Sequence, residues 1–286
     1  MKFKAFLTDN GTSLLEKRFL PALDKMGKVC HLYFTRDHTI FLHNLLNGDG
    51  VQSIAQFRKE ALFDNYRISS QNDDRIAFTI DLSLLQRAIR SSVSIYAEMG
   101  GGDGIGTGSN RLQIKLVKKL PPNSHQPLPF LTFESKGYKS AVIQDVPISK
   151  PLSRADVLEL QSALDMAQDL PRTLVQVPDL NQLQNYVDRM KHVGICLTSP
   201  LANMGIYIHG PRGQFRGDAQ TVQVSMKHFA KSLQCHLAKP DCAFYGIAQE
   251  GACLTVIFQF FIPGSRQNDK SISLHCRLPV LDPGSS

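Results

Sequence analysis

This 286-residue chain contains a glycine-rich stretch of the kind that can bind phosphate, but the flanking elements that a phosphate-binding loop needs are not predicted beside it. The strongest candidate is the glycine-rich stretch GGGDGIGTG at Gly100–Gly108. A phosphate-binding loop follows a strand and opens a helix, whose N-terminal amides hold the phosphate. Here a predicted strand, Arg111–Lys119, follows instead, and there is no Gly-Lys-Ser/Thr triplet. We interpret the stretch as a flexible hairpin, and a nucleotide-dependent enzyme is the third alternative.

The nucleophilic and metal-binding residue types are equally scattered. The six cysteines form no C-x-x-C pair, so the pattern favours reduced thiols and neither a zinc ribbon nor a redox motif. The chain contains no H-E-x-x-H and no G-x-S-x-G. His228 and His236 lie eight residues apart on a predicted helix, where solvent-facing or phosphate-facing positions are the favoured interpretation. We predict a non-enzymatic protein with no metal and no cofactor.

The basic residues, in contrast, are patterned. The formal net charge is +7, and the predicted helices place cations opposite an apolar stripe, with few carboxylates between them. Helix faces that carry mostly positive charge predict a polyanion partner, bound through phosphate contacts without sequence specificity. The alternative is an ordinary solvated surface. The predicted DNA-facing residues are Lys17, Arg18, Lys25, Lys28, Arg87, Arg90, Arg189, Lys227, Lys231 and Lys239.

A strand-and-helix unit that occurs twice must position these cations. Ala77–Arg90 reads as a strand ending at the N-cap Asp81, followed by a helix. Thr221–Gln234 repeats the pattern, with Ser225 as the matching cap. Such a repeat indicates an internal duplication.

The remaining elements alternate around this unit. A helix over Leu14–Lys28, capped by Ser13, carries Pro21, which should kink or break it. A helix over Leu180–Val193 is capped by Asp179. Most other segments read as antiparallel strands, which predicts an α+β fold with helices on one side of the sheets. We expect domains at 1–147 and 172–286, joined by a polar, partly helical connector at 148–171.

Six segments, in order along the chain, resemble one protein family. They are MKFKAFLTD, KMGKVCHLYFTRD, DLSLLQRAIRS, LQIKLVKK, VIQDVPISKPLSR and VIFQFFIPG. The chain is similar to the Hus-type subunit of the nine-one-one checkpoint clamp, most of all to its plant members, and so to the sliding-clamp superfamily of proliferating-cell nuclear antigen. The resemblance implies the DNA-clamp fold: two similar domains of antiparallel sheets with amphipathic helices on one layer.

The resemblance also implies a function. Such a subunit joins the two other subunits of the clamp in a heterotrimeric ring, and a clamp loader places the ring around double-stranded DNA at damage sites. Checkpoint signalling and repair, including double-strand break repair and meiosis, follow in the nucleus, with the cytoplasm as a second location. The ring closes by pairing of edge strands, here Tyr138–Val146, with the expected interface residues Tyr138, Ser140, Val142 and Gln144. No membrane partner is expected, because no apolar run approaches spanning length.

One segment departs from the family. Ile195–Ala219 has little strand alternation and no family likeness among its residues. We therefore expect an incomplete sheet in the second domain and the loss of one intersubunit edge. The alternative function is a protein-interaction module with the clamp fold that does not close a ring on DNA.

Overall fold

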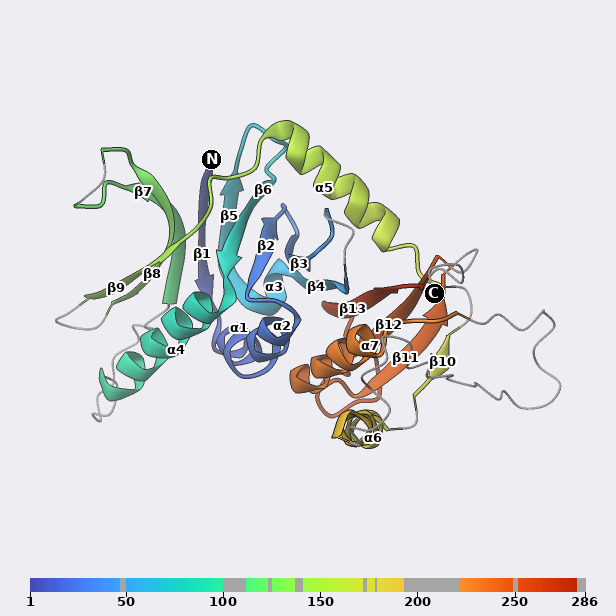
Figure 1. The fold of residues 1–286 in the computed structure, drawn as a ribbon. Helices are drawn as coiled ribbons and strands as arrows, with labels where there is room; N and C mark the ends of the chain where they lie inside the picture. The colour runs from blue at the N-terminus through green and yellow to red at the C-terminus, as the bar shows by residue number, and fades with distance from the viewer. Residues whose placement is uncertain are drawn as a thin grey trace.

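The described strands form two antiparallel sheets, seen in a computed structural model (Figure 1). The structure describes residues 1–46, 50–99, 112–122, 125–136, 141–171, 174–177, 179–192, 222–248 and 252–281. Within these ranges only the backbone is described for 93–99, 136, 141, 186 and 188–192.

The smaller sheet belongs to the N-terminal half. Its five strands, in spatial order, are β5 (Phe63–Ser69), β1 (Lys2–Leu7), β7 (Leu112–Lys119), β8 (Leu128–Lys136) and β9 (Ala141–Pro147). In β1, Phe3, Ala5 and Leu7 are buried, whereas Lys2 and Lys4 are exposed. This period of two places one face of the sheet against the core and the other toward water.

The larger sheet joins the two halves of the chain. Its eight strands, in order, are β10 (Val175–Gln176), β11 (Cys242–Ile247), β12 (Cys253–Gln259), β13 (Ile272–Pro279), β4 (Gln52–Arg58), β3 (His38–His43), β2 (Val29–Phe34) and β6 (Ile76–Asp81). The junction is the antiparallel pairing of β13 with β4, in which Leu274 lies opposite Ala55 and Cys276 opposite Ser53. The hydrogen-bonded ladder therefore runs without a break from one half into the other.

Helical segments cover one face of this framework. They are α1 (Asp9–Leu14), the π-helical η1 (Leu15–Phe19), α2 (Leu20–Met26), α4 (Leu82–Met99), α6 (Leu180–His192), α7 (Met226–Leu233) and the 3₁₀-helical η2 (Gln234–Ala238). The short α3 (Lys59–Leu62) connects β4 to β5 and was not expected from the sequence. The large core beneath the layer is rich in aromatic rings: Phe19 lies 4.7 Å from Phe57 and 5.1 Å from Phe260 between ring centroids.

The first helix begins earlier than the sequence predicted. Thr8, not Ser13, is its N-cap: the Thr8 hydroxyl accepts a hydrogen bond of 2.9 Å from the Gly11 amide. Pro21 neither ends the helix nor lies in the interior of an α-helical segment. It occupies the first turn of α2, directly after the π-helical η1. A proline has no amide hydrogen to donate, and the wider turn before it accommodates that missing bond.

The helix of the connector lies on the opposite face of the large sheet from the amphipathic helices, a placement that the sequence did not predict. This helix, α5 (Arg154–Ala167), begins with a capping box formed by Ser153 and Asp156. Its stripe Val157, Leu160, Leu164 and Ala167 packs on a second cluster that includes Tyr33, Ile40, Leu42, Ile54 and Ala77. A stripe with helical spacing needs an apolar surface, and the outward face of the large sheet provides it.

The connector also covers one edge of the large sheet. Ahead of α5, Ile148 forms a bridge with Ile80 of β6. The amides of Ser149 and Leu152 donate to the carbonyl oxygens of Thr79 and Ala77, at 3.1 and 2.8 Å. An unpaired edge strand can pair with other chains, and this contact protects the edge at β6.

The repeated unit is less regular than its sequence suggested. The first copy is β6 followed by α4, and the Asp81 carboxylate accepts a hydrogen bond from the Leu84 amide. In the second copy the strand is reduced to a bridge between Val224 and Val280, and the Ser225 side chain makes no capping hydrogen bond. The predicted cap at Asp179 is confirmed, since its carboxylate accepts from the amides of Asn181 and Gln182.

The other predictions lie partly outside the described residues. The stretches Gly100–Gly108 and Ile195–Ala219 are not described, so a flexible hairpin and an incomplete second sheet stay predictions. The division at 1–147, 148–171 and 172–286 also stays a prediction. In the described part of the chain, no helix is long and apolar enough to cross a membrane.

The reassigned cap gives a direct test. Thr8→Ala removes the hydroxyl that accepts from Gly11 and also donates to the Leu62 carbonyl oxygen at 3.3 Å. Loss of a cap costs about 1–2 kcal/mol, so the free energy of unfolding should fall by that amount. Ser13→Ala, at an exposed position of α1, is the control and should stay within about 0.5 kcal/mol of the parent chain. Denaturant unfolding measures both; a larger loss for Ser13→Ala would restore the original assignment.

Candidate nucleic-acid interface

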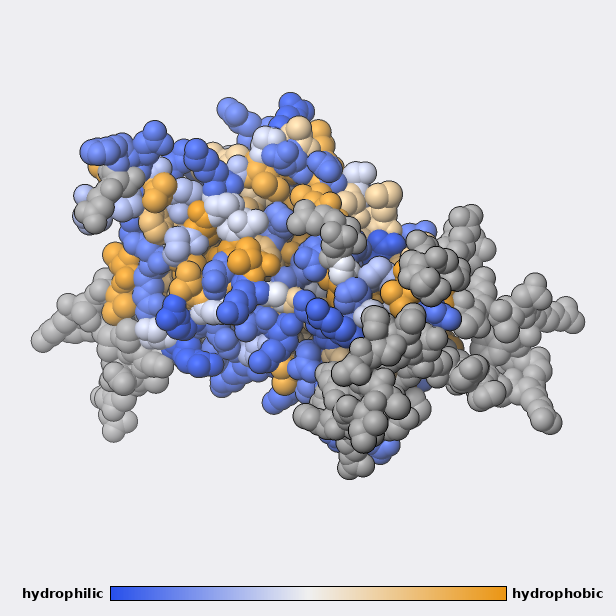
Figure 2. All heavy atoms as spheres, viewed as in Figure 1, coloured by the Kyte–Doolittle hydropathy of each residue, from blue (hydrophilic) through white to orange (hydrophobic). Residues whose placement is uncertain are grey.

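The helical segments that carry the predicted cations lie side by side. The segment α2 packs against α4 on one flank and against η2 and α7 on the other, and α7 packs against α6. Segments far apart in sequence thus form one layer along the lower side of Figure 1. Hydrophilic side chains cover this side of the molecule over α1 and α2 (Figure 2). The predicted cations are thereby brought onto a shared surface.

Most of the predicted cations reach solvent. Exposed positions are Lys17, Lys25, Lys28, Arg87, Lys227 and Lys239. Lys231 is half-buried. The side chain of Arg189 is not described, although its backbone lies in α6 as predicted. Phosphates at this surface would meet several independent ammonium groups, an arrangement that gives weak, additive and salt-sensitive contacts.

Arg18 differs from the others because its side chain is used inside the protein. The guanidinium donates to the carbonyl oxygens of Ala238 and Lys239 at 2.9 and 3.0 Å. Its central carbon lies 5.4 Å from the centre of the Phe260 ring. These contacts join η1 to the C-terminal end of η2, across a separation of 220 residues. Arg18 therefore links the two halves of the layer, a role that a sequence pattern could not show.

Two carboxylates moderate the charge of the layer. Glu16 accepts a hydrogen bond of 2.9 Å from Arg90, whose side chain is 62% exposed. Asp24 accepts from the Ser83 hydroxyl at 3.0 Å and so joins α2 to α4. Both contacts use the acidic side chains to hold helices together. The predicted DNA-facing role of Arg90 thus competes with an ion pair.

His43 positions the turn that carries Lys28. Its Nε2 lies 3.0 Å from the Gly27 carbonyl oxygen and its Nδ1 lies 2.8 Å from the Ser53 hydroxyl. Only an N–H can bond a carbonyl oxygen, so Nε2 donates and Nδ1 accepts from Ser53 in the neutral ring. Burial lowers the pKa of His43 to about 4, against a smaller opposing effect of the Gly27 contact. The ring is therefore neutral in the folded protein at physiological pH.

The two histidines singled out from the sequence, His228 and His236, lie in different surroundings. His236 Nδ1 lies 2.8 Å from the Leu233 carbonyl oxygen. Burial and the nearby Lys227 and Lys231 lower the pKa of His228. Among the described residues, no group of three or more His, Cys, Asp or Glu side chains could hold a metal ion.

A second candidate surface is the edge of the smaller sheet. In the described part of the chain β9 pairs only with β8, so one of its edges is unpaired. Val146 is buried while Ile143 is 54% exposed, which shows that alternate residues of β9 face the core. Gln144, on the core side, donates to the Ser91 hydroxyl of α4 at 2.6 Å. Of the four predicted interface residues, Tyr138 and Ser140 lie outside the described residues.

This geometry limits how Val142 and Gln144 could contribute to an interface. Both side chains lie on the face of β9 that is directed toward the helices, so they would contact a neighbouring subunit through the backbone. The odd-numbered residues of β9 face away from the helices. The Asp145 carboxylate there is held by Lys119 and Thr132, with contacts of 2.6 Å to each.

Two antiparallel sheets with a layer of helices on one face are the arrangement of the DNA-clamp fold. The solved structure of Proliferating Cellular Nuclear Antigen from Entamoeba histolytica is similar over 98% of this chain and 99% of that chain. The TM-score is 0.58 and the sequence identity is 10%, so the likeness concerns the fold alone. The α+β clamp fold predicted from the sequence is confirmed.

Within this class, the chain belongs to the family of Hus1-like proteins, whose model matches residues 1–206 and 207–266. A curated relative, the "Checkpoint protein hus1 homolog" of Dictyostelium discoideum, is 27% identical over 268 residues, covering 84% of this chain and 88% of the relative. The predicted family is confirmed. The two matched stretches meet within the segment 195–219, so the family match extends further into that segment than the quoted motifs indicated.

The role assigned to Arg18 is testable by truncation. Arg18→Ala removes two hydrogen bonds from a charged donor and a cation–aromatic contact. The free energy of unfolding should fall by about 2 kcal/mol. The adjacent Lys17→Ala, exposed and without such contacts, should change it by less than about 0.5 kcal/mol. Equal effects in denaturant unfolding would show that Arg18 is an ordinary surface cation.

The buried His43 predicts a pH dependence. Its pKa is about 4 in the folded chain and 6.5 when unperturbed, so the unfolded state binds the additional proton between these values. Stability is therefore retained above pH 6.5 and is lost as the pH falls from about 6.5 to 4, by about 1.4 kcal/mol per unit for this group.

The matched variant for this test is His43→Gln, which keeps an N–H donor but does not titrate. It should reduce the slope of unfolding free energy against pH between 6 and 5 by about 1.4 kcal/mol per unit. His275, whose pKa burial also lowers to about 4, contributes a separate slope that remains in both proteins. Parallel curves for parent and variant would contradict the assignment.

Proposed function

We propose that this Hus1-like checkpoint protein is a non-catalytic subunit of a heterotrimeric clamp that encircles double-stranded DNA at damage sites. In this proposal a clamp loader places the ring, which then supports checkpoint signalling and DNA repair in the nucleus. The observation that carries the proposal is the helical layer, where exposed cations from both halves of the chain share one surface.

Physical features of the layer support a sliding contact. Its exposed cations are mostly lysines, which lie on the helical segments or directly after them. Lysines hold phosphate as point charges and carry no base-specific geometry. Lys17, Lys25, Lys28 and Arg87 come from the N-terminal half, and Lys227 and Lys239 come from the C-terminal half. A duplex crossing the layer would meet both sets. Affinity would then depend on phosphate spacing and salt.

The unpaired edge of β9 supports assembly. A strand with free backbone donors and acceptors pairs readily with the edge strand of another chain. The connector contacts cover the edge at β6 of the large sheet. The smaller sheet has two described edge strands, β5 and β9, and of these β9 packs against α4 of the helical layer. We propose that one clamp subunit pairs here.

A second candidate function depends on the segment 195–219, which the sequence predicts to lack an edge strand. The family match covers this segment but is divided there into two stretches, 1–206 and 207–266. The alternative is an interaction module that has the clamp fold and does not close a ring. Assembly with the two partner subunits separates this alternative from the first proposal.

Charge reversal tests the DNA contact. The variant carries Lys17→Glu, Lys25→Glu, Arg87→Glu and Lys227→Glu, all exposed on the layer. Its control carries Lys2→Glu, Arg67→Glu, Lys150→Glu and Arg154→Glu, which are also exposed but lie on other elements. Both sets of four substitutions change the net charge equally. A difference in DNA retention between the two variants therefore comes from where the substituted residues lie on the protein.

The readouts are assembly with the two partner subunits by size-exclusion and retention of the loaded ring on a DNA circle. The layer variant should assemble normally and lose at least about tenfold in retention near 0.1 M salt, with a weaker salt dependence. The control should behave like the parent. Normal assembly with equal retention in all three proteins would contradict the DNA contact, whereas failure of the parent chain to assemble would favour the module.

A further inference from the structure

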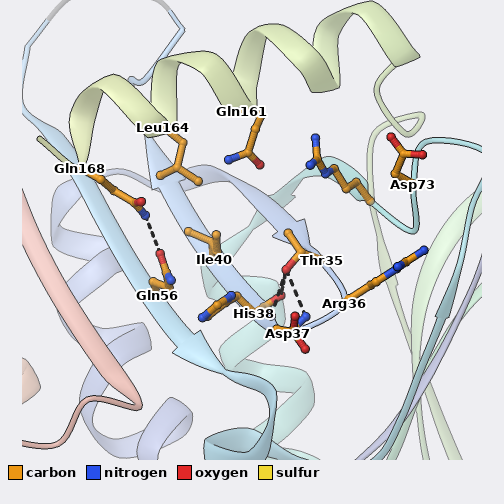
Figure 3. A pocket seen from close by; sticks show the side chains of 11 residues that line it. Thr35, Arg36, Asp37, His38, Ile40, Gln56, Asp73, Gln161, Leu164 and Gln168 are labelled. Carbon is orange, nitrogen blue, oxygen red and sulfur yellow. Dashed lines mark hydrogen bonds between the residues drawn. The ribbon is translucent and has the colours of Figure 1, made fainter.

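The two faces of the large sheet differ in what they offer to a charged ligand. On the outward face, a pocket of about 570 Å³ lies between α5 and the turn that joins β2 to β3 (Figure 3). Two aspartates and two arginines line it, and its glutamines Gln161 and Gln168 are already hydrogen-bonded within the chain. These groups favour neither sign of charge. On the face with the basic helical layer, by contrast, one exposed lysine is held in an unusual backbone conformation.

This lysine is Lys239, which follows the last residue of η2. Its backbone lies in the left-handed region, with φ +53° and ψ +58°. A side chain disfavours this region, and helix ends that need it usually carry glycine or asparagine. The next residue is Pro240, and a residue before a proline prefers extended backbone. Two local preferences oppose the observed conformation, so contacts from elsewhere in the chain must hold it.

Arg18 of η1 provides the main contact of this kind. Its guanidinium donates to the carbonyl oxygens of Ala238 and Lys239, at 2.9 and 3.0 Å. Carbonyl groups at the end of a helix have no partner within it, and here both are bound by one side chain. On the other side of the turn, the Asp241 carboxylate accepts a hydrogen bond of 2.7 Å from the Phe261 amide. The turn is therefore fixed from two directions.

The fixed turn lies where the two halves of the helical layer meet. The segment η2, from the C-terminal half, packs against η1 and α2, from the N-terminal half. Lys239 is exposed, and no hydrogen bond or ion pair of its side chain occurs in the part of the chain that the structure describes. Its ammonium group is thus available at the centre of the basic layer.

We propose that Arg18 is a positioning residue for Lys239, and that the fixed turn presents the Lys239 ammonium group to a phosphate of the duplex. This inference rests on the proposed function, because it takes DNA to be the polyanion on the layer. A lysine on a fixed backbone loses less conformational freedom on binding than one on a mobile segment. Glycine would relieve the backbone at position 239 but would carry no charge. Arg18 therefore supports DNA binding through Lys239 and not through its own charge.

The test is a double-mutant cycle on the retention of the loaded ring on a DNA circle. Lys239→Gln should shorten retention about threefold or more near 0.1 M salt and should reduce the slope of log retention against log salt by about one. Arg18→Lys keeps the net charge but loses the planar fork that binds two carbonyl oxygens, so it should shorten retention about twofold or more. In the Lys239→Gln background, Arg18→Lys should have no further effect.

Two further variants separate positioning from a structural role. Lys239→Gly removes the ammonium group and relieves the backbone, so it should shorten retention as Lys239→Gln does, with a thermal unfolding temperature no lower than that of the parent. Arg67→Lys, at an exposed position of β5 outside the layer, should leave retention unchanged. If Arg18→Lys fails to assemble, Pro240→Gly takes its place in the cycle with the same expectations, because it keeps both charges and frees the turn.

Additive effects of the Arg18 and Lys239 substitutions would overturn the inference, as would full retention in Lys239→Gln. In either case the four-site charge reversal of the layer, which includes neither residue, would still reduce retention, and the proposed function would stand. Equal retention of the parent ring and of that layer variant, or no retention of the parent ring, would overturn both the inference and the proposed DNA contact.

Discussion

The pairing of β13 with β4 is the contact on which the rest of the structure depends. Strands from opposite ends of the chain form a continuous antiparallel ladder there, and eight strands become one sheet. Without that pairing the two halves would be tethered only by the connector and by helix contacts. With it, both faces of the sheet extend across the molecule. The helices that pack on one face consequently share a surface, although they derive from residues 9–99 and 180–238.

The two faces of this sheet have different chemistry. The inner face is covered by the basic layer, whose exposed lysines favour a phosphate backbone. The outer face is covered by α5, whose apolar stripe is buried and whose amide side chains fix its position on the strands. The sheet itself separates the two surfaces, because its alternate side chains enter two different apolar clusters.

Charge on the helical layer serves both structure and binding. Arg18 and Arg90 are engaged by groups of the chain itself, whereas Lys17 and Lys25 extend into solvent. This division follows from side-chain chemistry. A guanidinium is planar and offers several donors, so it suits fixed carbonyl or carboxylate partners; an ammonium group is compact and strongly hydrated. Arginines within a mixed basic cluster are thus the first candidates for internal contacts, and lysines for a mobile polyanion.

The sequence by itself determined the elements and the class of fold, because apolar periodicity and caps are local properties. The strands at Val29–Phe34 and Cys242–Ile247, and the helix after Asp81, form where the patterns predicted. The order of matching segments was sufficient for the family. Only the tertiary structure decided that α5 covers the opposite face, since an amphipathic helix does not specify which apolar surface it will bury. Likewise, it showed that Thr8 replaces Ser13 as cap and that Arg18 joins the two halves. These outcomes depend on residues far apart in sequence that meet only when β4 and β13 have paired and the helices have packed.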